Sequence, residues 1–326
     1  MNWFILTVGC IILWGVTDIL YKASFLKNDP LSYYKSFVWV GIVMAMAGFI
    51  MGSLSETLFD SLKMIRDDVV YLVPLCLVYA FAFFFGLLGN KHLDASVVSP
   101  LENIDGAIAA IVIYFYYLLT GYIHPSYGLG VMDVIATVSI IIGIILIGRE
   151  EQGLMRKEMH LGEDKKKHRF GALALFFPII YNLVDGFLIA EINGINGNNG
   201  IVSQGAETAT PAIDFFVFEC VIFAIVAICI WLYMLIAKKY IYNPFQEEEL
   251  IRCGAATGET FGTMTFIFAS SINPVLTAPV TSMYCLVTMI LARIFLKERL
   301  TQKQYLSIGF LVIGIALFGI SEIFSV

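Results

Sequence analysis

The sequence predicts an all-α integral membrane protein of ten transmembrane helices, arranged as two inverted repeats of five. Three observations support this class. Of the 326 residues, 59% are hydrophobic and 14% are charged, and the mean hydropathy is +0.83, far from the balance of a soluble domain. The apolar residues gather in runs of about 20, the length a helix needs to cross a bilayer core of about 30 Å. These runs are continuously apolar, which favours helices over the alternating pattern of a membrane barrel.

Ten such runs follow one another along the chain. The first begins at the second residue and carries Asp18 without a small-residue cleavage site, so we interpret it as a membrane span and not a signal peptide. A polar segment after the fifth run divides the chain into a first repeat at 1–148, a linker at 149–169 and a second repeat at 170–326. The predicted spans are 2–24, 31–53, 69–90, 94–119, 128–148, 170–190, 209–238, 250–270, 274–296 and 301–323.

Three short matches relate the second half of the chain to the first. They are LDASVVSP at 93–100 with INPVLTAP at 272–279 (an offset of 179 residues), IIGIILIG ending at Gly148 with VIGIALFG ending at Gly319 (an offset of 171), and WGVTD ending at Asp18 with YNLVD ending at Asp185 (an offset of 167). Because five spans is an odd number, the second repeat must cross the membrane upside down relative to the first. Inverted repeats of this kind occur in transporters, whose substrate sites lie near the midplane between the halves.

Lysine and arginine are unevenly divided between the two sides of this predicted topology. Of the 20 basic residues, all but Lys63 and Arg66 fall on one side. Positively charged loops stay in the cytoplasm. We therefore expect a multi-pass protein of the cell membrane, with the linker 149–169 in the cytoplasm and both termini outside.

Two stretches resemble the drug/metabolite transporter superfamily, specifically its EamA-type members with two five-helix halves. They are ILWGVTDILYKAS at 12–24 and, more specifically, PVTSMYCLVTMILARIFLKERLTQKQYLSIGFLVIGIAL at 279–317. In that family the ninth helix starts near a proline, ends in a glutamate-containing turn and leads into a glycine-bearing last helix. The residues that fit this pattern are Pro279, Glu298, Leu300, Thr301, Gln304, Gly309 and Gly314. The first half lacks the glutamate turn. The resemblance implies transport of small metabolites by alternating access, and it also implies cytoplasmic termini, against the charge distribution.

Six carboxylates interrupt the predicted spans: Asp18, Glu102, Asp105, Asp185, Glu219 and Glu259. A charged side chain at the bilayer centre costs about 2.5–3.5 kcal/mol even on lenient insertion scales, so intramembrane acids mark candidate functional sites. No lysine or arginine lies deep in a predicted span to compensate them. We expect Glu102, with Asp105 on the same helix face, to bind a proton and a cationic substrate in turn, and Glu259 to face it from the other half.

Aromatic residues stand one turn before two of these carboxylates. Trp14 precedes Asp18 and Tyr181 precedes Asp185, and aromatic ring faces attract organic ammonium groups. The predicted binding site therefore comprises Glu102, Asp105, Glu259, Asp18, Asp185, Trp14 and Tyr181. Structural interpretations stay open, because Asp18 could pair with Lys22 four residues later, the other acids could bond neighbouring helices, and the aromatic rings could only pack.

Together these features predict a secondary transporter of a small cationic or zwitterionic metabolite, with protons as the coupling ion. We expect no enzyme, cofactor or metal site, since the sequence contains no glycine-rich phosphate loop and no His-Glu-x-x-His or Cys-x-x-Cys spacing. The expected partners are the substrate, protons and the lipid bilayer, with the chain as a monomer or homodimer and without nucleic acid. Two alternatives are an exporter of neutral amino acids or hydrophobic drugs, and a membrane scaffold or receptor that transports nothing.

Overall fold

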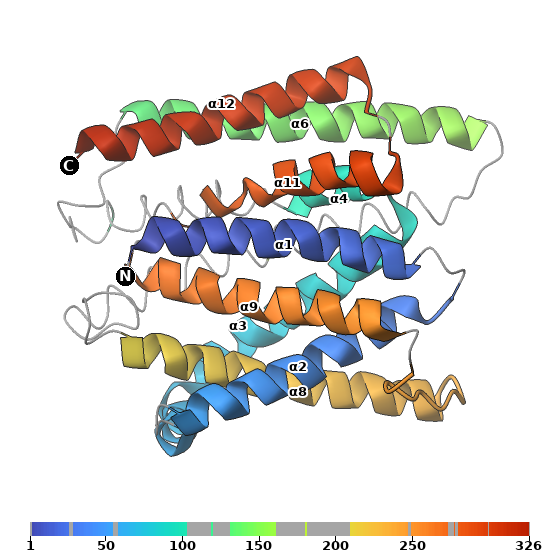
Figure 1. Cartoon of the computed structure of the whole chain (residues 1–326), viewed down its shortest axis with the longest axis vertical. Coiled ribbons are helices and arrows are strands. Elements are labelled where there is room, and N and C mark those ends of the chain that lie inside the picture. Colours follow the sequence, from blue (N-terminus) through green and yellow to red (C-terminus); the bar gives the residue numbers. More distant parts are fainter. Residues whose placement is uncertain are drawn as a thin grey trace.

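The computed structural model describes residues 2–25, 29–54, 58–102, 119, 131–160, 180, 209–246, 249–272, 277, 280–298 and 300–325. All regular elements in this part of the chain are helices, and they lie alongside one another (Figure 1). They are α1 (Trp3–Phe25), α2 (Ser32–Leu54), α3 (Leu58–His92), α4 (Ala95–Glu102), α6 (Val131–His160), α8 (Ala209–Ile236), α9 (Leu250–Ile272), α11 (Tyr284–Leu291), the π-helical turn η3 (Ala292–Leu296) and α12 (Gln302–Ser325).

Most helix bounds follow the apolar runs of the sequence. Helices α1, α2, α8, α9 and α12 begin and end within two residues of the predicted spans. Helix α3 starts earlier than predicted, and α6 continues through residues 149–160, the first part of the segment expected to be a linker. That extension, REEQGLMRKEMH, consists largely of residues with high helix propensity, so the helix continues beyond its apolar run. The predicted span 170–190 and most of 94–119 lie outside the described residues.

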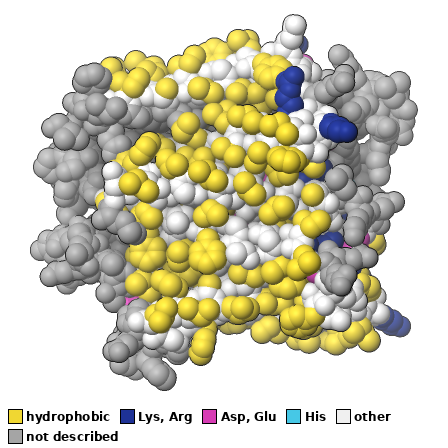
Figure 2. Space-filling model, viewed as in Figure 1, with side chains coloured by type: hydrophobic (Ala, Val, Ile, Leu, Met, Phe, Trp, Pro, Cys, Tyr) yellow, Lys and Arg dark blue, Asp and Glu magenta, His cyan; other side chains and the backbone are white. Residues whose placement is uncertain are grey.

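Three described helices are long and apolar enough to cross a membrane: Trp3–Phe25, Ser32–Leu54 and Ala212–Ile236. Their outer faces carry large apolar side chains, such as Ile5 (68% exposed), Phe49 (65%) and Ile228 (55%). Figure 2 shows hydrophobic side chains spread across the middle of the visible face, with lysine and arginine gathered at one end. An apolar surface of this extent suits contact with lipid and not with water.

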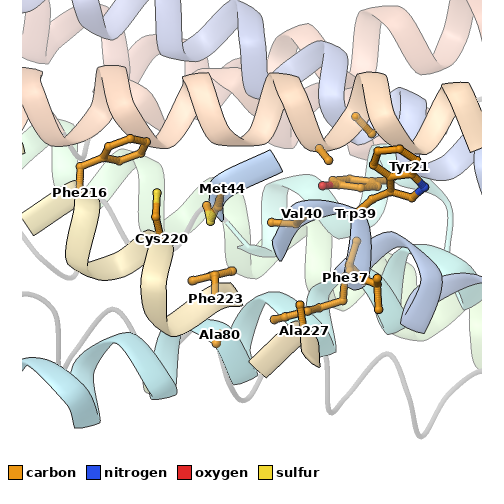
Figure 3. Packing of buried hydrophobic residues seen from close by; sticks show 14 of the residues in the cluster. Tyr21, Phe37, Trp39, Val40, Met44, Ala80, Phe216, Cys220, Phe223 and Ala227 are labelled. Carbon is orange, nitrogen blue, oxygen red and sulfur yellow. The ribbon is translucent and has the colours of Figure 1, made fainter. Parts of the chain in front are cut away.

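The largest buried cluster lies where α2 packs on α8, with further residues from α1, α3 and α9 (Figure 3). Phe37 of α2 stacks on Phe223 of α8, with ring centroids 5.7 Å apart and ring planes at 1°. Met44 and Met234 are fully buried in the same cluster. Dense packing matters here because lipid tails are as apolar as these side chains, so van der Waals contact must hold the helices together.

Glycines bring α2 and α8 into close contact. A Cβ at Gly41 would overlap the Cβ of Ala227, and a Cβ at Gly48 would lie 2.7 Å from the Cβ of Cys220. The residue number therefore rises along α2 as it falls along α8, which means that the two helices are antiparallel.

Helices α6 and α12 form a second antiparallel pair. A Cβ at Gly314 of α12 would lie 2.7 Å from the backbone oxygen of Ala136, and the Ser139 hydroxyl donates to the backbone oxygen of Phe310 at 2.8 Å. Both contacts join the first half of the chain to the second.

Glu298, in the turn before α12, caps the N-terminus of α4. The backbone N–H of Ala95 donates to Oε1 at 3.1 Å, and the backbone N–H and hydroxyl of Ser96 donate to Oε2 at 3.0 and 2.5 Å. A carboxylate at this position satisfies amide groups that have no partner within the helix and interacts favourably with the helix dipole. Glu298 therefore links the second half of the chain to a helix of the first half.

We expect alanine in place of Glu298 to lower the free energy of unfolding by about 1–2 kcal/mol, because the first amides of α4 lose their acceptors. Thermal unfolding of the purified protein measures this loss. The matched control is Glu150→Ala, whose pair with Lys303 (78% exposed) spans 3.2 Å at the surface and contributes little. Equal losses from the two variants would contradict a capping role for Glu298.

Candidate functional site

The candidate site forms where α1 packs on α9, antiparallel and through a row of glycines. Gly262 lies against the ring of Trp14, and Gly258 lies against the hydroxyl of Thr17, so closely that a Cβ at either glycine would overlap its neighbour. Glycine at every fourth residue lets two helix backbones approach in this way. The segment GAATGETFG thus makes the close helix contact that its small residues suggest.

This packing brings Asp18 and Glu259 to the same level of the helix pair. Asp18 directly follows Thr17, and Glu259 directly follows Gly258, the two residues in contact. Each acid is only 8% exposed, and their carboxyl groups lie within electrostatic reach of each other. The structure therefore joins one predicted site residue from each half of the chain.

Hydroxyl groups from two further helices surround Asp18. The hydroxyl of Thr288 on α11 donates to Oδ2 of Asp18 at 2.9 Å, and Ser99 of α4 lies against the same carboxylate. Both residues are buried. Asp18 is thus the point where α1, α4, α9 and α11 meet.

Lys22 has contacts away from this carboxylate. Its Nζ donates to the backbone oxygen of Asn90 at 2.9 Å and to that of Leu93, which ties α1 to the end of α3. The sequence also allows a pair of Asp18 with Lys22, and these two hydrogen bonds of Lys22 go to backbone oxygens. The hydrogen bonds to Asp18 described here come from the hydroxyl groups of Thr288 and Ser99.

Glu102 ends α4, one turn beyond Ser99 and on the same helix face. Its carboxylate lies against Gly86 of α3, where a Cβ would overlap Oε1. Glu102 is therefore on the face of α4 that meets Asp18. Three other predicted site residues, Asp105, Asp185 and Tyr181, lie outside the described residues.

Trp14 lies between two aromatic rings of the second half. Its ring centroid is 5.5 Å from those of Phe266 on α9 and Tyr284 on α11. Sequence reasoning paired Trp14 with Tyr181 as the repeat-related residue, and it did not find Phe266 or Tyr284, which only the packing of α1 brings near. The motif around Tyr284 gave no sign of this contact.

Tyr79 of α3 extends the acidic region toward α8. It lies within electrostatic reach of Glu259 and of Glu219, which is 4% exposed. Within the described part of the chain, no three histidine, cysteine or acidic side chains are grouped so that they could hold a metal ion. The arrangement is a set of buried acids beside aromatic rings, which suits a proton or an organic cation.

Comparison with known proteins shows a likeness to one family in the second half of the chain. The model of the EamA-like transporter family matches residues 195–320. This part of the chain is similar to that family. EamA-like proteins are part of the drug/metabolite transporter superfamily and are in general membrane transporters, not enzymes. The EamA-like half contributes Glu259, Phe266, Tyr284 and Thr288 to the site.

The fold of the EamA-like half and of the preceding residues is also found in a solved structure. One crystal structure, described only as that of a protein, matches with a TM-score of 0.57 at 13% sequence identity, over 97% of each chain. At this identity the match shows the fold alone. No curated protein matches the sequence.

Proposed function

We propose that this EamA-like protein is a secondary active transporter that moves a small cationic or zwitterionic metabolite by alternating access, coupled to protons. One observation carries the proposal: Asp18 and Glu259, from opposite halves of the chain, are buried together at the contact of α1 with α9. The aromatic side chain of Trp14 lies one turn away.

The chemistry of this pair supports exchange of a cation for a proton. Two buried carboxylates within electrostatic reach cannot both be ionised unless a positive charge compensates them. A proton or a cationic substrate can supply that charge, and binding of one releases the other. The rings around Trp14 would favour an organic ammonium group over an inorganic ion.

Helix contacts support ten spans in an inverted repeat, with repeats at 1–148 and 170–326. Adding the offset of 179 residues to Gly41 gives Cys220, and adding it to Gly48 gives Ala227. Exchanging the halves therefore converts the contact of Gly41 with Ala227 into the contact of Gly48 with Cys220. Likewise Ser139 and Phe310, which are hydrogen-bonded, are separated by 171 residues, the offset of a second sequence match. Such reciprocal contacts are expected around a two-fold axis in the membrane plane.

The proposed orientation places the basic end of the molecule in the cytoplasm, since positively charged loops stay there. Lysine and arginine gather at that end in Figure 2, whereas α1 begins and α12 ends at the opposite end in Figure 1. A cysteine at Asn198 is therefore expected to react with impermeant reagents added to intact cells, and a cysteine at Lys166 is not. The reverse labelling pattern would place both termini in the cytoplasm, as the family resemblance implies. It would contradict the orientation inferred from the charge distribution.

A thermal-shift screen of the purified protein against amines, amino acids, nucleosides and sugars tests the proposed substrate class, because a ligand stabilises the folded state that binds it. We expect the hits to cluster among amines and zwitterions. Hits confined to sugars or phosphates would contradict the proposal, and hits confined to neutral apolar compounds would favour an exporter of hydrophobic drugs. Uptake into liposomes then separates a transporter from a scaffold, which moves nothing under any gradient.

A further inference from the structure

Buried polar groups line α1 and α2 between the candidate site and the basic end. They are the hydroxyl groups of Thr17, Tyr21 and Ser36 and the indole N–H of Trp39. Each of these residues is at least nine-tenths buried. Within the described part of the chain the hydroxyl groups of Thr17, Tyr21 and Ser36 have no hydrogen-bond partner, whereas the indole of Trp39 lies within hydrogen-bond reach of Tyr242. Buried polar groups in native proteins are hydrogen-bonded, where necessary by internal water. We therefore expect ordered water along this line.

Among these polar groups, Tyr21 lies near the carboxylates of the candidate site. It is 2% exposed and lies within electrostatic reach of Glu259, Asp18 and Tyr79. Its ring packs on Phe83 at 6.0 Å between centroids. Tyr21 and Trp39 both belong to the buried cluster drawn in Figure 3.

At the other end, an ion-pair network connects Trp39 to the surface. Tyr242 lies against Trp39, and its hydroxyl donates to Oε2 of Glu249 at 2.7 Å. Arg252 is 2.7 Å from Oε1 of Glu249 and 3.7 Å from Oδ2 of Asp29. The network therefore joins the start of α9 to the segment between α1 and α2.

Asp29 is the member of this network that meets solvent, with a side chain 23% exposed. Partial burial alone would raise the pKa of Asp29, but the hydrogen bond and ion pair with Lys35 at 2.8 Å, together with a backbone amide and Arg252, lower the pKa below its ordinary value. Asp29 is therefore ionised at neutral pH, as a group that collects protons from solution must be.

The helix geometry gives the length of the gap between site and network. Arg252 and Glu259 are seven residues apart on α9, which corresponds to about 10 Å along the helix. Arg252 donates to the backbone oxygen of Ser24 at 3.2 Å, and Gly258 lies against Thr17. Tyr21, halfway between Thr17 and Ser24 on α1, therefore stands midway along the gap.

We propose that Tyr21, with internal water held by Thr17 and Ser36, forms a proton route between the carboxylates of the site and the Glu249–Arg252–Asp29 network at the basic end. This inference rests on the proposed function, because it assigns the path by which the coupling proton reaches the site. In each transfer the Tyr21 oxygen accepts a proton from one side and gives its own hydroxyl proton to the other, so Tyr21 ends neutral and one proton has moved. The charged and titratable groups that face Tyr21 are Asp18, Glu259 and Tyr79.

The test follows protonation of the site directly and needs no known substrate. The full-length protein is reconstituted into liposomes sorted so that the basic end faces the medium, and infrared spectroscopy records the carboxylic-acid C=O band after a rapid drop in external pH. The band is assigned to the site by its loss in the Asp18→Asn, Glu259→Gln double variant. We expect Tyr21→Phe, which removes only the hydroxyl, to slow the rise of the band by at least about tenfold. The matched control, Tyr233→Phe on the exposed surface of α8, is expected to leave the rate unchanged.

Two results would overturn the route: a rate for Tyr21→Phe within about twofold of the wild type, or no site carboxyl band at any pH at which the protein stays folded. Choline counterflow at equal pH on both sides tests the proposed function separately, since choline carries a fixed charge and exchange requires no net proton movement. If choline is not exchanged but the band still depends on Tyr21, the substrate class is wrong and the route is supported.

Discussion

Glutamine in place of Glu259 is expected to abolish uptake driven by a pH gradient while leaving the protein folded and inserted. The amide keeps the size of the side chain but can neither bind a proton nor balance the charge of a substrate. Loss of a group that transfers protons typically costs factors of 10² to 10⁴, so we expect a decrease of at least about 100-fold. Uptake into liposomes of the amine that most stabilises the protein, measured against imposed pH gradients, checks this result.

Matched variants distinguish the carboxylates of the site from carboxylates elsewhere in the protein. Asp18→Asn is expected to give the same loss, because the two carboxylates lie within electrostatic reach of each other. Glu150→Gln, at the surface of α6, is expected to transport normally. Glu102→Gln decides whether the residue favoured by the sequence belongs to the same unit. If Glu259→Gln keeps its pH dependence while Glu102→Gln loses it, the proton site lies at the end of α4 and not between α1 and α9.

Many of the helix positions can be predicted from the pattern of apolar and polar residues along the sequence. The runs that form α1, α2, α8 and α9 are mostly apolar and bounded by polar residues, so their ends can be predicted within two residues. The end of α6 could not be predicted in this way. Residues 149–160 have high helix propensity but are not apolar, so the helix continues beyond the apolar run.

The site depends on contacts distant in sequence, and this limits what the sequence can predict. The cost of a buried acid identified Asp18 and Glu259 as unusual, and the glycines beside Glu259 indicated a close helix contact. Nothing in the sequence specified that α1 would be the helix in contact, or that Thr288 and Ser99 would supply hydroxyl groups to Asp18. The spacing of four residues allows Lys22 to pair with Asp18. The sequence does not show that the long side chain of Lys22 also reaches a backbone carbonyl group at the end of α3.

The largest effect on folding is expected from leucine in place of Gly41. A single Cβ at Gly41 already overlaps the Cβ of Ala227 and lies 3.0 Å from the backbone oxygen of Phe223. The backbone cannot give way by a change of rotamer, so α2 must move away from α8 and open the cluster around Phe37. Overpacking of buried sites costs typically about 1–3 kcal/mol and occasionally more, and we expect a loss of about 3 kcal/mol or more here. Thermal unfolding and the yield of monodisperse protein measure it.

The matched control for this variant is Gly9→Leu on α1, because a Cβ at Gly9 meets no atom within 4 Å. Both variants add the same side chain to a membrane helix and remove the same flexible residue, so the difference in stability between them reports the contact alone. The symmetry of the α2–α8 pair adds a second comparison: Gly48→Ala places its Cβ 2.7 Å from the Cβ of Cys220, and the double variant with Cys220→Gly removes that clash. Recovery of stability in the double variant would confirm direct contact, whereas equal stability of Gly41→Leu and Gly9→Leu would show that α2 and α8 do not pack through these glycines.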